Sequence, residues 1–134
     1  MKSDEQILEE IGEAARGLFR MSEGDYAVEP FGLGAGQAPD HATLRRAAGA
    51  ADDAGVTADA PETFFRPAAF IESSGGGAFG PAPAARVEGL SRALLGNLSE
   101  VKVYRVGEVN IAVYVLGRSA GGNWLGVSTR VVET

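Results

Sequence analysis

Cysteine is absent from the 134 residues of this chain, and histidine occurs once, as His41. The lack of cysteine excludes a disulfide framework and any metal site built from thiolates. It also fits a reducing compartment, so we expect a cytoplasmic protein. His41 has no second His, no Cys and no paired carboxylates at ligand spacing, so we interpret it as a helix-start residue. We therefore expect the protein to need no cofactor.

Long apolar runs and secretion signals are missing as well. No apolar run is long enough to cross a bilayer, and residues 1–6 lead directly into a helical pattern. The sequon at Asn97-Leu98-Ser99 carries no weight without a secretion signal. The length and the hydrophobic fraction of 45% suit a single domain over residues 1–134, with no membrane contact.

Catalytic motifs are scarce. The glycines at 32, 34 and 36 fail the dinucleotide-binding pattern, because Gln37 stands where a third glycine is needed, and we interpret this stretch as a turn. A Gly-x-Ser-x-Gly elbow is also absent. Glu9 and Glu13 lie four apart on one predicted helix face, but such pairs are usually solvated surface. We predict a protein that is not an enzyme; a hydrolase or lyase acting through these two glutamates is the alternative.

Negative charge is concentrated at the start of the chain. The net charge is −6, and residues 1–30 hold eight carboxylates against three basic residues, a local net of −5. Such a surface repels nucleic acid and attracts basic proteins or cations, although the ordinary interpretation is a solvated helix face. We therefore predict a protein partner and no nucleic acid.

The segment 101–134 organises the predicted fold. Three runs rich in Val, Ile, Leu and Tyr predict strands at about 101–106, 109–117 and 124–132. Gly107-Glu108 predicts a two-residue type II′ turn between the first two strands. The middle run is apolar on both faces, so we expect it at the centre of the sheet with helices on both sides.

The rest of the chain predicts an α+β fold with one mainly antiparallel sheet. Ser3 and Gln6 form a capping box for a helix that stops near Met21, and Pro30 places the next strand at a sheet edge. Further expected features are a helix capped by Asp40 and reaching Ala48, a loop over 49–61, a helical turn at 62–65 that uses Phe64 and Phe65 as core anchors, and a flexible stretch at 73–81. The last helix is expected at 83–97, with Val87, Leu90, Leu94 and Leu95 facing inward.

Several of these segments resemble a known family. They are 7–18, Met21-Ser22-Glu23-Gly24-Asp25-Tyr26, Phe64-Phe65, 103–109, 113–117, and the closing run 126–134 that ends at Thr134. Together they resemble the nuclease A inhibitor family over nearly the whole chain, most strongly at both ends. The resemblance is weak at about 34–62 and 68–82.

The resemblance implies an α-β-α sandwich similar to the plant pathogenesis-related protein fold, and a monomeric inhibitor. Its implied partner is a sugar-non-specific endonuclease of the ββα-metal type, whose Mg²⁺ the terminal residue Thr134 would ligate with Glu23 beside it. Hydroxyl and carboxylate oxygens are the hard ligands that Mg²⁺ prefers. The implied partner-binding residues are Ser22, Glu23, Asp25, Ser74, Gly75, Glu133 and Thr134.

One part of the family pattern is missing. The family has an aromatic contact in the loop after the Phe-Phe turn, and the matching stretch here, about 73–77, has no aromatic residue. Phe70 and Phe79 are the candidates to replace it. The alternative function is a non-inhibitory module that binds another basic protein.

Overall fold

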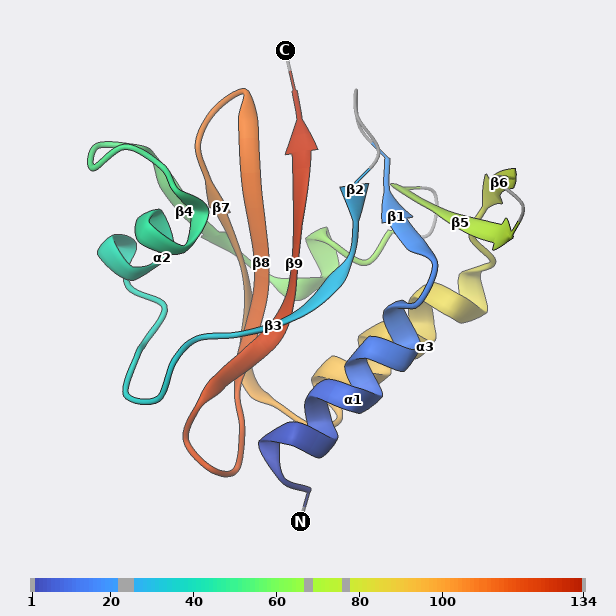
Figure 1. Cartoon of the computed structure of the whole chain (residues 1–134), viewed down its shortest axis with the longest axis horizontal. Coiled ribbons are helices and arrows are strands. Elements are labelled where there is room, and N and C mark those ends of the chain that lie inside the picture. Colours follow the sequence, from blue (N-terminus) through green and yellow to red (C-terminus); the bar gives the residue numbers. More distant parts are fainter. Residues whose placement is uncertain (1, 22–25, 67–68, 76–77, 134) are drawn as a thin grey trace.

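The computed structural model describes residues 2–21, 26–66, 69–75 and 78–133 (Figure 1). Its helices are α1 (Asp4–Ala15), α2 (His41–Ala48) and α3 (Ala84–Leu95), with a 3-10 turn η1 (Pro61–Thr63). The larger antiparallel sheet has the order β3 (Glu29–Gly32), β9 (Trp124–Val132), β8 (Asn110–Arg118), β7 (Ser99–Val106), β4 (Val56–Asp59). The smaller has the order β2 (Tyr26–Ala27), β1 (Leu18–Arg20), β5 (Phe70–Gly75), β6 (Ala78–Pro81). The predicted α+β class and the antiparallel pairing are confirmed, but the prediction of one sheet is wrong, because the described strands form two.

Strand β8 lies at the centre of the larger sheet, as its two apolar faces predict. Ile111, Val113 and Val115 join the core that packs against α1 and α3, whereas Tyr114 and Leu116 join the smaller core beneath α2. Helices therefore cover both faces of this sheet (Figure 1). The similarity to the plant pathogenesis-related protein fold stays a prediction.

The predicted two-residue turn at Gly107-Glu108 is wrong. Val106 lies opposite Ala112, so the turn spans more residues than two. A two-residue turn would place Val106 opposite Val109 and shift the register by an odd number of residues. Such a shift would move the apolar residues of one strand to the other face of the sheet. The two cores therefore select the longer turn.

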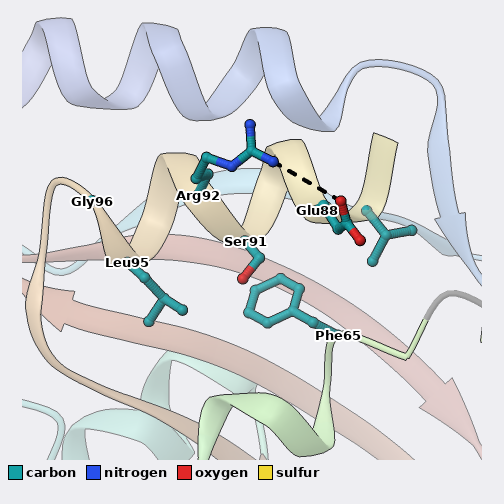
Figure 2. A pocket seen from close by; sticks show the side chains of 7 residues that line it. Phe65, Glu88, Ser91, Arg92, Leu95 and Gly96 are labelled. Atoms are coloured by element: carbon teal, nitrogen blue, oxygen red, sulfur yellow. Dashed lines mark ion pairs between the residues drawn. The ribbon is translucent and has the colours of Figure 1, made fainter. Parts of the chain in front are cut away.

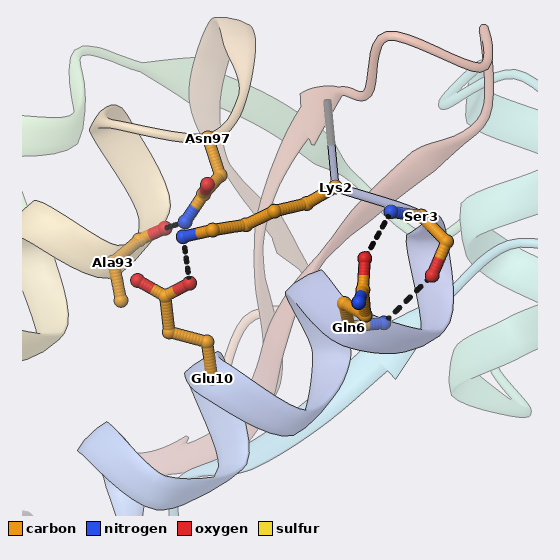
Figure 3. Close-up of polar contacts among 6 residues, drawn as sticks. All are labelled: Lys2, Ser3, Gln6, Glu10, Ala93 and Asn97. Atoms are coloured by element: carbon orange, nitrogen blue, oxygen red, sulfur yellow. Dashed lines mark hydrogen bonds and ion pairs between the residues drawn. The ribbon is translucent and has the colours of Figure 1, made fainter.

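Helix α1 begins as predicted and ends earlier than predicted. Ser3 accepts a hydrogen bond from the Gln6 amide, and the Gln6 side chain accepts one from the Ser3 amide, which confirms the capping box (Figure 3). The predicted end near Met21 is wrong: Ala15 is the last helical residue. Gly17 follows with φ +74°, a left-handed conformation that suits glycine, and the chain then enters β1.

Four strands form where the sequence predicts none. β1 falls within the expected first helix, β4 within the expected loop over 49–61, and β5 and β6 overlap the expected flexible stretch 73–81. The last is rich in Ser and Gly, which have low strand propensity. Pairing with neighbouring strands and burial of Phe70 (1% exposed) provide the stabilisation that propensity lacks.

Helix α3 connects the two sheets. Val87, Leu90 and Leu94 are buried as predicted, and burying such a side chain contributes about 1.5–3 kcal/mol. The prediction that Leu95 also faces inward is wrong, because 45% of its surface is exposed. Arg86 pairs with the Glu72 carboxylate of β5 at 2.9 Å and donates to the Arg16 carbonyl. The smaller sheet is thereby held against α3 and the end of α1.

Three local predictions are confirmed. Asp40 caps α2 by accepting from the Thr43 amide at 2.8 Å, and Pro30 lies in β3 at the edge of the larger sheet. Phe64, directly after η1, is fully buried. The stretch interpreted as a turn is strand at its start: Gly32 is the last residue of β3, and the turn follows it, with the Gln37 amide donating to the Gly34 carbonyl at 2.9 Å.

Candidate functional site

Glu133, at the end of β9, is the described residue of the predicted carboxyl-terminal site. Glu133 follows the last residue of β9, and its amide donates to the Val109 carbonyl at 2.9 Å. Its carboxylate pairs with the Arg105 guanidinium of β7 at 2.8 Å. Glu133 is thus fixed through both its backbone and its side chain.

Arg20, at the end of β1, lies beside this pair. Its guanidinium carbon is 4.9 Å from the centre of the Phe64 ring, and its Nη1 donates to the Phe64 carbonyl at 3.4 Å. Burial lowers the pKa of Arg20. The positive charges of Arg105 and Arg66 lower this pKa further, whereas the negative charge of Glu133 raises it. Arginine stays protonated at neutral pH despite such shifts. The carboxylate of Glu133 therefore interacts with the guanidinium groups of both Arg105 and Arg20.

Four of the predicted partner-binding residues lie outside the described residues: Ser22, Glu23, Asp25 and Thr134. The described residues next to them can be placed. Met21 and Tyr26 border 22–25; the Met21 amide donates to the Ala69 carbonyl at 2.8 Å, and the Tyr26 carbonyl accepts from the Thr129 hydroxyl of β9 at 3.3 Å. The end of β1, the start of β2 and the end of β9 all lie at the same end of the molecule (Figure 1).

Ser74 and Gly75, the other two predicted contacts, belong to the last part of β5. β5 and β6 pair as neighbouring antiparallel strands. An apolar groove of about 470 Å³ beside them is lined by Met21, Phe70, Ile71, Phe79, Gly80, Pro81 and Ala82. Phe79 is 55% exposed and contacts Phe19 edge to face, with ring centres 5.2 Å apart. Met21 is 43% exposed. This groove, the Met21–Phe79 groove, adjoins residues 22–25 through Met21.

The acidic helix α1 forms a separate surface. Glu5, Glu9 and Glu13 line a shallow pocket with Pro30, and Glu13 pairs with Arg16 at the rim. Over the described part of the chain, no cluster of three or more His, Cys, Asp or Glu residues could hold a metal ion. Glu9 and Glu13 are exposed. This surface has the features of a solvated helix face.

A further pocket, of about 550 Å³, lies between α3 and Phe65. Phe65, Ser91, Leu95 and the Glu88–Arg92 pair line it, with 3.9 Å between the charged atoms (Figure 2). It contains none of the predicted site residues.

No helix in the described ranges is long and apolar enough to cross a membrane.

Sequence reasoning missed the arginines of the site and the exposure of Met21. Arg105 and Glu133 are 28 positions apart, and they meet only because β7 and β9 flank β8. The signal was present in part: Arg105 interrupts an apolar strand pattern, and a charged residue there needs solvent or a partner. Its partner is revealed by the register of the strands.

The sequence matches a model of a family described as nuclease A inhibitor-like protein, over residues 5–134. No curated protein matches it.

Proposed function

The chain belongs to the nuclease A inhibitor-like family, and from this premise we propose that it inhibits a Mg²⁺-dependent, sugar-non-specific endonuclease of the ββα-metal type. The family description implies a nuclease partner and a non-catalytic role. In the proposal, Thr134 reaches the metal of the nuclease and Glu23 acts beside it. The finer assignments come from the resemblance of both chain ends to the family.

The observation that carries the proposal is that the described residues bordering 22–25 and the end of β9 lie at one end of the molecule (Figure 1). Tyr26, which follows 22–25 in the sequence, accepts a hydrogen bond from the Thr129 hydroxyl of β9, and Glu133 follows β9 directly. A single enzyme groove is thus within reach of both segments, since a residue extends the chain by at most about 3.6 Å. A terminal Thr offers a hydroxyl and a carboxylate, and both are hard oxygen donors that suit Mg²⁺.

Phe79 is the proposed aromatic anchor of the interface. Phe70, the other candidate, is fully buried and cannot contact a partner, whereas more than half of Phe79 is exposed. Phe79 also lines the Met21–Phe79 groove together with Met21, the residue that precedes Ser22 in the sequence. Exposed aromatic side chains next to pockets are common sites of binding energy in protein interfaces.

The first experiment is digestion of a plasmid by a purified nuclease of this type in Mg²⁺, with and without the protein. The untagged protein is expected to suppress cleavage of both DNA and RNA by direct, saturable binding. Unchanged cleavage by several such nucleases would favour the alternative, a module for another basic protein, which a pull-down with each nuclease would separate from an inhibitor.

A pair of tagged variants tests the role of the terminal residue. We expect a short tag added after Thr134 to weaken inhibition roughly 30-fold or more, as removal of a central interface contact of about 2 kcal/mol does. The same tag placed before Met1 is the control, because α1 begins at the opposite end of the molecule from the end of β9 (Figure 1). Circular dichroism and the melting temperature should be equal for both. Full potency of the carboxyl-terminal fusion would contradict the mechanism.

A further inference from the structure

The last described residue is held by a contact that crosses the sheet. β8 separates β7 from β9, yet Arg105 of β7 reaches Glu133 beyond the end of β9, with Nη2 2.8 Å from Oε2. The side chain of Arg105 is 28% exposed and that of Glu133 is 54% exposed. The pair therefore lies at the surface and is partly shielded from solvent on the arginine side.

Arg105 has a rigid support. It lies in β7 with Thr57 of β4 opposite on one side and Val113 of β8 opposite on the other. Its backbone is thus held between two neighbouring strands, so its guanidinium starts from a fixed point. Arg20, held over the Phe64 ring, adds a second positive charge that attracts Glu133.

Glu133 is the only residue between the end of β9 and Thr134. The hydrogen bond that its backbone amide donates to the Val109 carbonyl fixes the backbone of Glu133, and the ion pair with Arg105 fixes the Glu133 side chain. Two contacts, one through the backbone and one through the side chain, therefore act on Glu133. Terminal residues usually fray when nothing holds them.

We propose that Arg105 is a positioning residue for the carboxyl-terminal end of β9: it holds the Glu133 carboxylate and so fixes the residue that precedes Thr134 in the sequence. The consequence for inhibition rests on the proposed function. Arg105 lowers the entropy that the terminus would otherwise lose on binding, which is preorganisation. Glu133 then acts through Arg105 inside the protein, without needing a contact to the partner.

The effect on affinity should be modest, because a partly exposed ion pair cannot order a segment by more than its own free energy. We expect Arg105→Gln and Glu133→Gln each to weaken inhibition roughly fivefold, equivalent to about 1 kcal/mol. The double variant should also lose roughly fivefold, since either change removes the same pair. Arg105→Lys, which keeps the charge, should stay within about twofold of the wild type.

Arg92→Gln is the matched control. It breaks an exposed Arg–Glu pair of α3, with 3.9 Å between its charged atoms, by the same substitution. Its potency should equal that of the wild type. If Arg105→Gln alters the circular dichroism spectrum, Glu133→Gln carries the test, because it leaves β7 unchanged.

A second measurement needs no nuclease. In the free protein, ¹⁵N heteronuclear NOE values and amide exchange at Glu133 and Thr134 should report greater mobility in Arg105→Gln than in the wild type, with no change in Arg92→Gln. Unchanged values at both residues would overturn the inference, as would a 25-fold additive loss of inhibition in the double variant. Increased mobility in a protein that inhibits no nuclease would instead reject the proposed function and leave the positioning role standing.

Discussion

Phe70 and Phe79 lie nine positions apart and have opposite environments. Phe70 is 1% exposed and packs against Phe64, with ring centres 5.4 Å apart. Phe79 is 55% exposed and, among the described aromatic rings, contacts that of Phe19 edge to face. The same residue type thus stabilises the core at one position and is available to a partner at the other. The difference comes from pairing of β5 with both β1 and β6, which encloses Phe70 and leaves Phe79 on the edge strand.

Phe79→Ala is therefore expected to weaken nuclease inhibition by roughly 2 kcal/mol, about 30-fold, and to lower the free energy of unfolding by no more than about 1 kcal/mol. Inhibition assays and urea denaturation measure the two effects. Leu95→Ala is the control, because Leu95 is similarly exposed, at 45%, on α3. Equal potency of the Phe79 variant and the wild type would remove this residue from the interface.

Helix α1 is connected to the sheet at its first residue. The side-chain amide of Asn123, a residue in the turn between β8 and β9, donates a hydrogen bond to the Asp4 carboxylate at 2.6 Å. Bonds from Asn123 and Ser119 lower the pKa of Asp4. Asp4 also lies in the first turn of α1, where the helix dipole favours negative charge. One carboxylate thus both stabilises the helix start and orients the helix on the sheet.

The pH dependence follows from the sign of this shift. A folded-state pKa below the unfolded value contributes stability that is present above the unfolded pKa, about 3.9, and is lost as pH falls through the folded pKa. Asp4→Asn should therefore be less stable than the wild type at pH 7, and the difference should shrink below about pH 4. Urea unfolding at several pH values measures it. A difference that is constant across this range would show that the charge has no role.

The ends of the molecule differ in charge and in proposed role. α1 begins near the β8–β9 turn, whereas Glu133 lies near the β7–β8 turn, so the length of β9 separates them (Figure 1). A strand of nine residues spans roughly 30 Å, and charges are screened over about 8 Å at physiological ionic strength. The concentration of negative charge in residues 1–30 predicts attraction between this region and a basic partner. The structure instead places the start of α1 far from the end of β9.

The variant Glu5→Gln/Glu9→Gln tests this arrangement. We expect its association rate with the nuclease at physiological ionic strength to stay within about twofold of the wild type, because screening isolates the start of α1 from the interface. Stopped-flow or surface-based kinetics provide the measurement. A large loss of inhibition would mean that the protein binds through α1, in agreement with the alternative of a module for basic proteins.

Features that depend on local chemistry or on a long apolar pattern can be predicted from the amino-acid order alone. These include the capping box of α1, the Asp40 cap of α2, the buried face of α3, the three carboxyl-terminal strands and the central place of β8. The family resemblance, carried by the two ends of the chain, is confirmed by the match over residues 5–134. In each case the signal lies within one segment, so its interpretation needs no knowledge of what packs against it.

The remaining features depend on contacts between segments that are distant in the chain. β1, β4, β5 and β6 are only three to six residues long, and they form because neighbouring strands complete their hydrogen bonds. The two cores set the length of the β7–β8 turn, and strand order brings Arg105 to Glu133. The choice of Phe79 over Phe70 also depends on strand order. Contacts between residues distant in sequence have no local signature, because their geometry exists only after the chain has packed.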